Sequence, residues 1–409
     1  MLFNVRVVPP RTKVPAMKLL AALPLVSSLA LFIACSSTVK DAPVATPPAA
    51  DDAGVDDTTD AAPEAAPPAN DAYEQAVIAS KWTKLAGAPS HTDGSKMDDI
   101  FFTSPMVGYA ADGPGGAITK TTDGGATWNP VFKHAGTYFR SVAFVDEMHG
   151  FAGNLGAGLS GSITDTTVLY ETKDAGATWN PVTTITGSKP AGICNLTTID
   201  ATHLVAVGRA NGPAHVMMSS DAGANWTATD LGKQMSMIID ARFTSPTDGI
   251  IVGMGAGSET VCTILHTKDA GATYEKVFAS KTANSLCWKL SFPSDKVGYV
   301  AVQDAADGPP TFAKTTDGGA TWVESKLPVK TTSAGGFPAI GIGFVTEKVG
   351  WVSPEDATLP TYRTTDGGAT WTIDATLKSP INRFRFVDKN TAFAIGGAIW
   401  KLQIDTSTP

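Results

Sequence analysis

The chain of 409 residues has few charges and few of the residues that enzymes commonly use for catalysis. Only 17% of its residues are charged, and it contains eight arginines, six histidines and four cysteines. The histidines are scattered, and none pairs with another histidine or with a cysteine at a metal-ligand spacing. The chain also has no Walker loop and no Gly-x-Ser-x-Gly motif. We therefore expect no catalytic residues, no cofactor and no metal.

The charge that is present is mainly negative, with 39 acidic residues against 31 basic ones and a formal net charge of −8. A surface of this sign does not attract nucleic acid, so we expect no nucleic-acid partner. The 40 glycines and 27 prolines, together with 43% hydrophobic residues, indicate a turn-rich β protein with a core. A wholly disordered chain is excluded.

An export signal is indicated near the start of the chain. Lys18 is followed by an apolar run of small residues, Leu19 to Ala34, which is too short to span a bilayer comfortably. A small residue directly before Cys35, at the end of such a run, resembles the bacterial lipobox, whose cysteine carries lipid. The resemblance implies that residues 1–34 are a signal peptide and that Cys35 is the membrane anchor. Residues 1–16 look like neither a signal nor a domain, so we expect Met17 to be the true start. The alternative is an ordinary signal peptide followed by an incidental cysteine.

Residues 35–78 are expected to form a disordered tether after the lipidated cysteine. Residues 36–80 contain 13 alanines, six prolines and nine acidic residues but almost no large apolar side chain. Such a segment cannot bury enough surface to offset the entropy lost on ordering. We therefore expect a lipid-anchored protein on the extracytoplasmic side of a bacterial cell envelope. In a Gram-negative source it would lie on the outer membrane or the cell surface.

One octapeptide recurs six times, with the pattern Thr/Ser-x-Asp-Gly/Ala-Gly-Ala-Thr/Asn-Trp/Tyr. Its aspartates, at steps of 51, 47, 48, 48 and 49 residues, are Asp123, Asp174, Asp221, Asp269, Asp317 and Asp366. A period of this length suits four short strands with their turns, which is the size of one propeller blade.

Each octapeptide is expected to form the turn of a hairpin. Aspartate can accept hydrogen bonds from nearby backbone N–H groups, and glycine can adopt a positive φ. Each copy offers one carboxylate and no second one at a coordinating spacing, so we expect the six aspartates to be structural. The octapeptide resembles the Asp box of bacterial neuraminidase repeats.

A second pattern, an apolar strand, a turn and another strand, precedes each octapeptide and occurs seven times. Its copies span residues 99–109, 141–151, 195–205, 240–250, 289–299, 341–351 and 383–393. The seventh unit lacks a fourth strand, whereas residues 80–86 match a fourth strand that has no unit of its own. We therefore predict an all-β, seven-bladed β-propeller of four-stranded antiparallel blades over residues 79–405, with its last blade completed by the N-terminal strand.

Three cysteines remain if Cys35 carries lipid. Cys262 begins an expected third strand and Cys287 begins the first strand of the next unit, and strands of these two kinds start on the same face of a propeller. Export permits a disulfide. A Cys262–Cys287 disulfide, with Cys194 as the spare thiol, and three isolated thiols are the two alternatives.

The combined pattern over residues 80–403 resembles the photosystem II stability and assembly factor family of seven-bladed propellers. The resemblance implies a non-catalytic scaffold that binds another protein during assembly. Sialidases share the octapeptide and imply glycoside hydrolysis, but this chain lacks their Arg-Ile-Pro motif. We expect a monomeric binding propeller whose ligand is an unidentified protein or polysaccharide. The alternative is a carbohydrate-active enzyme of sialidase-like propeller type.

The ligand is expected on the face of the ring opposite the octapeptides, because the loops there vary in length and sequence. Aligning the first strands of the units places seven residues near the channel mouth on that face: Asp98, Asp99, Arg140, Asp240, Trp288, Lys289 and Arg383. We expect these residues to form the binding surface, and alanine at Arg140, Trp288 and Arg383 to weaken binding with little change in melting temperature. The alternative is that the charges only solvate strand ends.

Overall fold

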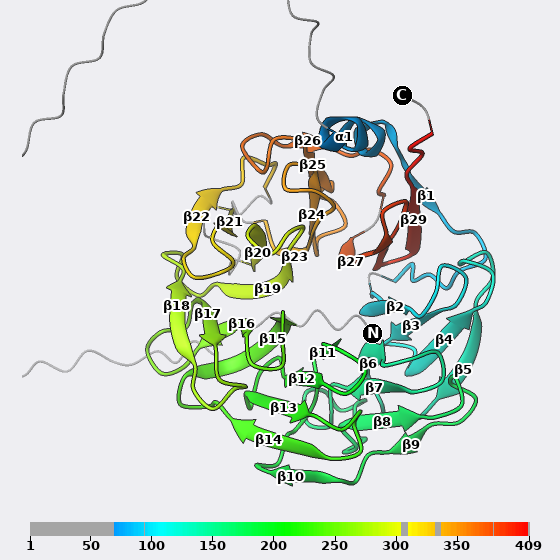
Figure 1. Ribbon diagram of the computed structural model, residues 1–409, viewed down its shortest axis with the longest axis vertical. Coiled ribbons are helices and arrows are strands. Elements are labelled where there is room, and N and C mark those ends of the chain that lie inside the picture. Colours follow the sequence, from blue (N-terminus) through cyan, green and yellow to red (C-terminus); the bar gives the residue numbers. More distant parts are fainter. Residues whose placement is uncertain (1–68, 94, 304–309, 332–336, 379, 408–409) are drawn as a thin grey trace, which may run out of the picture. The chain divides into compact units, whose positions relative to one another are not determined.

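The computed structural model describes residues 69–93, 95–303, 310–331, 337–378 and 380–407. Seven β-sheets surround a central axis in this part of the chain (Figure 1). The predicted all-β, seven-bladed propeller is confirmed. The expected signal peptide, Cys35 and most of the expected tether lie outside the described residues. No helix among the described residues is long and apolar enough to cross a bilayer.

The first three blades follow one another along the chain. Blade 1 contains β2 (Asp99–Phe102), β3 (Gly108–Asp112), β4 (Ala117–Thr121) and β5 (Asn129–Lys133). Blade 2 contains β6 (Phe139–Phe144), β7 (Gly150–Asn154), β8 (Leu169–Thr172) and β9 (Asn180–Pro181). Blade 3 contains β10 (Ile185–Gly187), β11 (Asn195–Thr198), β12 (Leu204–Gly208), β13 (His215–Ser219) and β14 (Trp226–Asp230).

The next three blades have four strands each. Blade 4 contains β15 (Met235–Phe243), β16 (Gly249–Gly255), β17 (Cys262–Thr267) and β18 (Glu275–Ala279). Blade 5 contains β19 (Leu286–Ser291), β20 (Gly298–Gln303), β21 (Thr311–Thr315) and β22 (Val323–Lys326). Blade 6 contains β23 (Ala339–Phe344), β24 (Gly350–Pro354), β25 (Tyr362–Thr364) and β26 (Thr372–Ile373).

Blade 7 joins strands from the two ends of the described chain. It contains β27 (Ile381–Asp388), β28 (Thr391–Gly396), β29 (Ile399–Gln403) and β1 (Trp82–Lys84). β1 pairs antiparallel with β29, with Trp82 opposite Leu402. Trp82 is buried, and its ring meets that of Trp351 on blade 6 edge to face at 5.4 Å. The innermost strand β27 contacts both β23 of blade 6 and β2 of blade 1, so the ring of innermost strands is closed.

The spacing between phenylalanine and glycine in five of the seven repeats has a steric cause. In blade 2, Phe144 ends the first strand and Gly150 begins the second. A Cβ atom on Gly150 would lie 2.4 Å from Cδ1 of Phe144, because the ring lies directly over the glycine. Glycine is therefore the residue that lets the aromatic ring pack flat against the hairpin.

The octapeptides form compact turns that use their own side chains. In blade 1, Oδ1 of Asp123 accepts hydrogen bonds from the Thr127 backbone N–H at 2.9 Å and from the Thr121 hydroxyl at 2.8 Å. Oδ2 accepts from the Thr127 hydroxyl at 2.6 Å, and Gly125 has a φ of 94°. These hydrogen bonds lower the pKa of Asp123 to about 2, chiefly through Thr127. Both carboxylate oxygens are thus used within the turn.

Blade 3 departs from the prediction of four antiparallel strands. The connection from blade 2 contributes β10, which pairs in parallel with β14 and extends the sheet to five strands. Ile185 lies opposite Trp226, and the Thr186 hydroxyl donates to the Trp226 carbonyl at 3.1 Å. The physical reason is that the outermost strand has unpaired backbone groups to which this long connection can bond.

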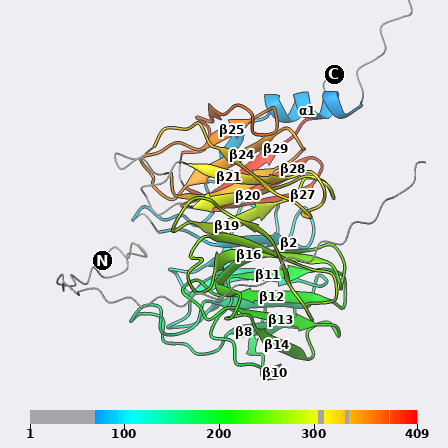
Figure 2. The same ribbon diagram turned by 90° about the vertical axis from the view of Figure 1, so that its left-hand side faces the viewer.

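A helix, α1 (Ala69–Ala79), occupies part of the segment expected to be disordered. Val77 is fully buried in a cluster with Trp82 and Trp351, and the Tyr73 hydroxyl donates to the Lys389 carbonyl at 2.7 Å. The prediction was wrong for residues 69–78 because composition averaged over the whole segment hid these apolar side chains. In both views α1 and β10 lie at opposite edges of the ring (Figures 1 and 2).

Candidate functional site

The seven expected site residues lie on the innermost strands or directly before them. Their places are Asp98 and Asp99 at the start of β2, Arg140 on β6, Asp240 on β15, Trp288 and Lys289 on β19, and Arg383 on β27. The fold brings all of them to the innermost strands, which surround the axis of the ring (Figure 1). None is more than 9% exposed. They therefore line the interior of the ring and do not form an exposed docking surface.

Arg383 joins two aspartates that come from different blades. Its Nε lies 3.0 Å from Oδ1 of Asp99, and its Nη2 lies 3.1 Å from Oδ1 of Asp240. Asp99 is also 3.0 Å from Nη2 of Arg385 and accepts the backbone N–H of Val142 at 3.3 Å. These contacts hold blades 1, 2, 4 and 7 together at the axis.

Arg140 forms a second buried pair. Its Nη1 lies 2.7 Å from Oδ1 of Asp98, whose other nearby cation is Lys96 at 3.7 Å. The Arg140 guanidinium lies 5.0 Å from the centre of the Trp288 ring, within the range of a cation–π contact. Trp288 thus packs against a cation inside the channel and is not an exposed anchor.

We call the seven charged residues of the axis the channel cluster: Asp98, Asp99, Arg140, Asp240, Lys289, Arg383 and Arg385. Burial raises the pKa of Asp240, but the positive charges of Arg383, Lys289 and Arg385 outweigh that effect and lower it. Burial, and then the positive charge of Arg383, lower the pKa of Lys289 to about 7. Asp240 is therefore held as an anion by these cations, and the pKa of Lys289 lies near neutral pH.

The sequence prediction missed Arg385 and Asn382. Arg385 follows Arg383 by two residues on β27, and strand periodicity could have placed it on the same side of the sheet. Asn382 accepts the Trp288 indole N–H at 3.0 Å and donates to the Asp98 carbonyl at 2.8 Å. No sequence signal marks this asparagine, because its partners lie on two distant strands.

Apolar side chains fill the part of the channel beside these charges. They are Leu155, Ile163, Cys194, Met237, Ile239, Leu286, Trp288 and Ile340. The connection between β7 and β8, residues 155–168, contributes two of them, Leu155 and Ile163. Arg209 holds this loop by donating from Nη1 to the carbonyls of Leu155, Gly156 and Ala157. The loop is thus folded inward and is anchored to blade 3.

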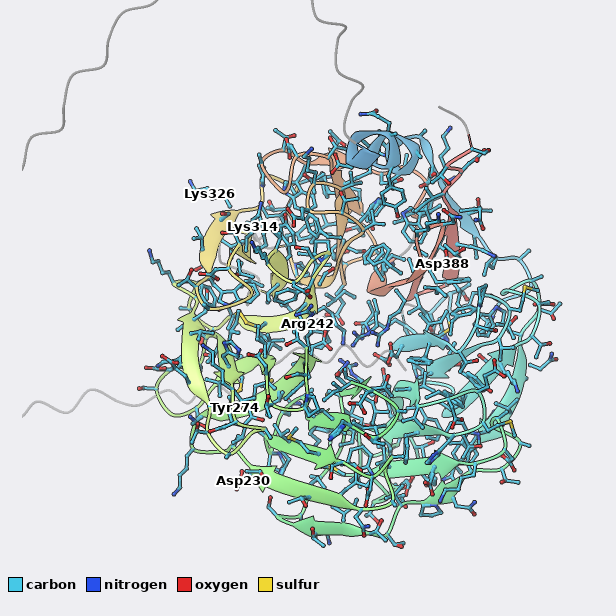
Figure 3. All side chains as sticks on the ribbon, viewed as in Figure 1. Asp230, Arg242, Tyr274, Lys314, Lys326 and Asp388 are labelled. Carbon is cyan, nitrogen blue, oxygen red and sulfur yellow. A yellow bond between two sulfur atoms is a disulfide. The ribbon has the colours of Figure 1, made fainter. Side chains whose placement is uncertain are left out.

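A groove lies elsewhere, between the outermost strands β18 of blade 4 and β22 of blade 5. It has a volume of about 890 Å³ and is lined by Val277 to Ala279, Lys281 to Asn284, Thr311 and Trp322 to Lys326. Val323 is 66% exposed in it. The connection after β18, the start of β21 and the end of β22 all belong to the face opposite the octapeptides, which we call the loop face. Lys326 lies at the outer edge of the ring (Figure 3).

Glu324 builds one wall of this groove. Its carboxylate accepts hydrogen bonds from the hydroxyls of Ser280, at 2.7 Å, and Thr311, at 2.8 Å, and from the Lys281 backbone N–H at 2.9 Å. Burial raises the pKa of Glu324, but these hydrogen bonds outweigh it and lower the pKa. The Glu324 carboxylate is thus occupied by hydrogen bonds within the protein, and these bonds attach the loop after β18 to blade 5.

A disulfide between Cys262 and Cys287 holds the same loop from its other end. The two Cα atoms are 4.5 Å apart and join β17 of blade 4 to β19 of blade 5. The Ser285 hydroxyl accepts the Cys262 backbone N–H at 3.0 Å. Cys194 is a buried free thiol. The loop along the groove is therefore pinned at Glu324 and at the disulfide.

The described residues contain no group of three or more histidine, cysteine, aspartate or glutamate side chains arranged to hold a metal ion. The channel carboxylates also do not form a pair free for acid–base chemistry. A hydrolase of glycosides needs two carboxylates that can reach the substrate from either side. Here Asp99 and Asp240 both bind the Arg383 guanidinium and are buried.

The chain matches no protein-family model and no curated protein. Among solved structures, YCF48 bound to a D1 peptide is similar, with a TM-score of 0.57 and 15% identity over 80% of this chain and 97% of that one. YCF48 from Cyanidioschyzon merolae has a TM-score of 0.58 and 17% identity over 79% of this chain and 99% of that one. The GH74 xyloglucanase from Xanthomonas campestris has a TM-score of 0.57 and 16% identity over 81% of this chain and 55% of that one. At these identities the likeness shows that the fold is shared by binding proteins and glycoside hydrolases alike.

Proposed function

We propose that this protein is a lipid-anchored, extracytoplasmic binding propeller that holds an extended segment of another protein in the groove between blades 4 and 5. The groove carries the proposal, because apolar surface, free backbone groups and charge lie together in it, between the outermost strands of blades 4 and 5. Phe278, Trp322 and Val323 supply the apolar surface. Lys281 and Lys326 supply exposed positive charge.

The backbone of β22 provides a docking edge. Among the described strands it pairs only with β21, so its outer side offers unpaired N–H and C=O groups. An extended peptide can add to such an edge as a further strand. Blade 3 contains this arrangement within the chain itself, since β10 pairs with the outermost strand β14.

The charge of the groove favours an acidic segment with an apolar residue. Glu324, the acidic residue of the lining, is engaged by Ser280, Lys281 and Thr311 within the fold. The lysines of the lining are exposed. A segment with one apolar side chain on Val323 and acidic side chains near Lys281 and Lys326 would satisfy both features.

Two further observations support a binding role. The octapeptides resemble the Asp box, and their aspartates are used inside the turns, which leaves the loop face as the variable one. YCF48, a propeller of the same fold, carries a D1 peptide.

The lipobox-like sequence before Cys35 supports anchoring at an extracytoplasmic membrane surface. The alternative, a carbohydrate-active enzyme, is supported by the GH74 neighbour but not by the arginine-bound carboxylates of the channel.

The test is a selection of random peptides displayed on phage against the propeller, followed by calorimetry with the enriched peptides. We expect acidic peptides with an apolar residue, and at least about tenfold weaker binding to Val323→Asp, because a buried carboxylate would face the apolar side chain. Ile373→Asp is the matched control, since Ile373 is 59% exposed on the outermost strand of blade 6.

Two outcomes would contradict the proposal. Equal affinity of the enriched peptides for the parent and for Val323→Asp would show that the peptides do not bind in the groove. Enrichment of no peptide, together with binding or cleavage of a polysaccharide on a glycan array, would favour the carbohydrate-active alternative.

A further inference from the structure

The channel cluster contains more positive than negative charge. Its buried cations, Arg140, Lys289 and Arg383, equal its buried anions, Asp98, Asp99 and Asp240, in number. Arg385, whose side chain is 32% exposed, adds one positive charge. Lys96 adds a further cation beside Asp98, at 3.7 Å. The nearby Asp112 is paired with His91 at 2.9 Å instead. An uncompensated charge in a buried site is costly, so the cluster requires either loss of a proton or a counter-ion.

Several buried hydrogen-bond donors of the channel have no partner. Lys289 is 2% exposed and Arg140 is 4% exposed. In the part of the chain that the structure describes, Nζ of Lys289 and both Nε and Nη2 of Arg140 have no hydrogen-bond partner. On the adjacent innermost strand β11, Nδ2 of Asn195 is in the same situation. The single acceptor of the cluster without a partner is Oδ2 of Asp98. Buried donors therefore outnumber buried acceptors.

Arg140 and Lys289 act on each other electrostatically. The positive charges of Arg383 and Arg140 both oppose protonation of Lys289, after burial itself. Water molecules could accept hydrogen bonds from these donors, but water does not neutralise the excess charge. A small anion does both, because it accepts several hydrogen bonds and supplies the missing negative charge.

We propose that the channel holds a small monovalent inorganic anion, such as chloride, between Arg140 and Lys289. The site is small because the same residues are already packed: Arg140 against the Trp288 ring, and Trp288 against Asn382 through its indole N–H. The anion would act as a structural counter-ion that ties β6 of blade 2 to β19 of blade 5 across the axis. This site is separate from the groove and does not depend on the proposed function.

The test compares melting temperatures in sodium chloride and sodium gluconate at constant ionic strength, because gluconate is too large for the site. An anion that binds only the folded state raises the melting temperature by about 2 °C for each tenfold rise in concentration above its dissociation constant. We expect this rise for the parent protein and for Lys268→Met, an exposed-lysine control. We expect no chloride-specific rise for Lys289→Met.

Crystals of the parent protein grown in sodium bromide give a second readout that does not depend on a variant. We expect an anomalous peak between the Arg140 guanidinium and Nζ of Lys289. Bromide found on the exposed surface alone, an adventitious ion only, would overturn the proposal. A chloride response of Lys289→Met equal to that of the parent would overturn it as well.

Discussion

Arg383 of blade 7 and Asp240 of blade 4 meet across the axis of the ring, with Nη2 of the arginine 3.1 Å from Oδ1 of the aspartate. The two blades are not neighbours, and the two residues are 143 positions apart in the sequence. The pair is buried, with exposed fractions of 6% and 1%. A contact of this kind ties the inner strands together where no backbone hydrogen bond connects them.

We expect Arg383→Ala to lower the free energy of unfolding by about 3–5 kcal/mol, because it leaves Asp240 buried without its arginine and Asp99 with Arg385 as its remaining ion-pair partner. Urea denaturation measures the change. The control is Arg242→Ala, whose partner Asp295 is almost fully exposed, and it should cost no more than about 1 kcal/mol. Similar losses for the two variants would show that the axis pair contributes no more than a surface pair. This prediction replaces the expectation that alanine at Arg383 leaves stability unchanged.

We expect Asp317→Ala to lower stability by about 1 kcal/mol. The reason is that the Thr321 backbone N–H, the Thr321 hydroxyl and the Thr315 hydroxyl all lose their acceptor in an exposed turn. Trp322 ends the octapeptide of Asp317 and lines the groove, so peptide affinity is measured on the equivalent Asp123→Ala, whose turn lies in blade 1, and it should not change. A folded Asp123→Ala protein that no longer binds would contradict the assignment of binding to the groove between blades 4 and 5.

Lys289 should make stability depend on pH in a buffer free of small anions. Its pKa is lowered to about 7 in the folded protein, so between pH 7 and its ordinary value near 10.5 the unfolded chain binds more protons than the folded one. Stability should therefore rise with pH through this window, by at most about 1.4 kcal/mol per pH unit. The charged groups that act on Lys289 are Arg383, Asp240, Arg140 and Asp99.

The measurement is urea denaturation at pH 7, 8 and 9 for the parent and for Lys289→Met. The methionine variant should lose the rise, because its side chain has no proton to exchange. An identical slope in the two proteins would assign the pH dependence to another group.

We expect deletion of residues 80–86 to destabilise the ring by several kcal/mol, since it removes the ladder between β1 and β29 and the burial of Trp82 together. Deletion of residues 36–66 should leave the melting temperature unchanged. Thermal denaturation of the two proteins makes the comparison. Equal melting temperatures would show that β1 contributes nothing to the ring.

We expect Cys35→Ser to abolish membrane anchoring, because the expected tether has no apolar segment to hold a membrane. The variant should be soluble or should keep its signal peptide unprocessed. Fractionation of cells and mass spectrometry of the mature N-terminus distinguish these states. A processed variant that still sediments with membranes would contradict the lipoprotein prediction.

The sequence by itself determined the number of blades and the structure of their turns. The octapeptide turn depends on residues at most a few positions apart, such as Asp123 and Thr127, so its hydrogen bonds can be predicted from the local pattern. The same holds for Phe144 and Gly150, whose packing follows from one hairpin. Because the repeat period is regular, aligning the repeats also predicted correctly that the seven expected site residues lie on the innermost strands or directly before them.

Only the tertiary structure decided how those residues are used. The burial of Asp240 and its pairing with Arg383 depend on the closure of a ring through seven blades, which no local pattern encodes. The helix α1, the added strand β10 and the groove beside Glu324 likewise depend on surfaces supplied by distant segments. The physical reason is that turn hydrogen bonds form between sequence neighbours, whereas burial and charge pairing are set by whichever distant side chains the closed ring brings together.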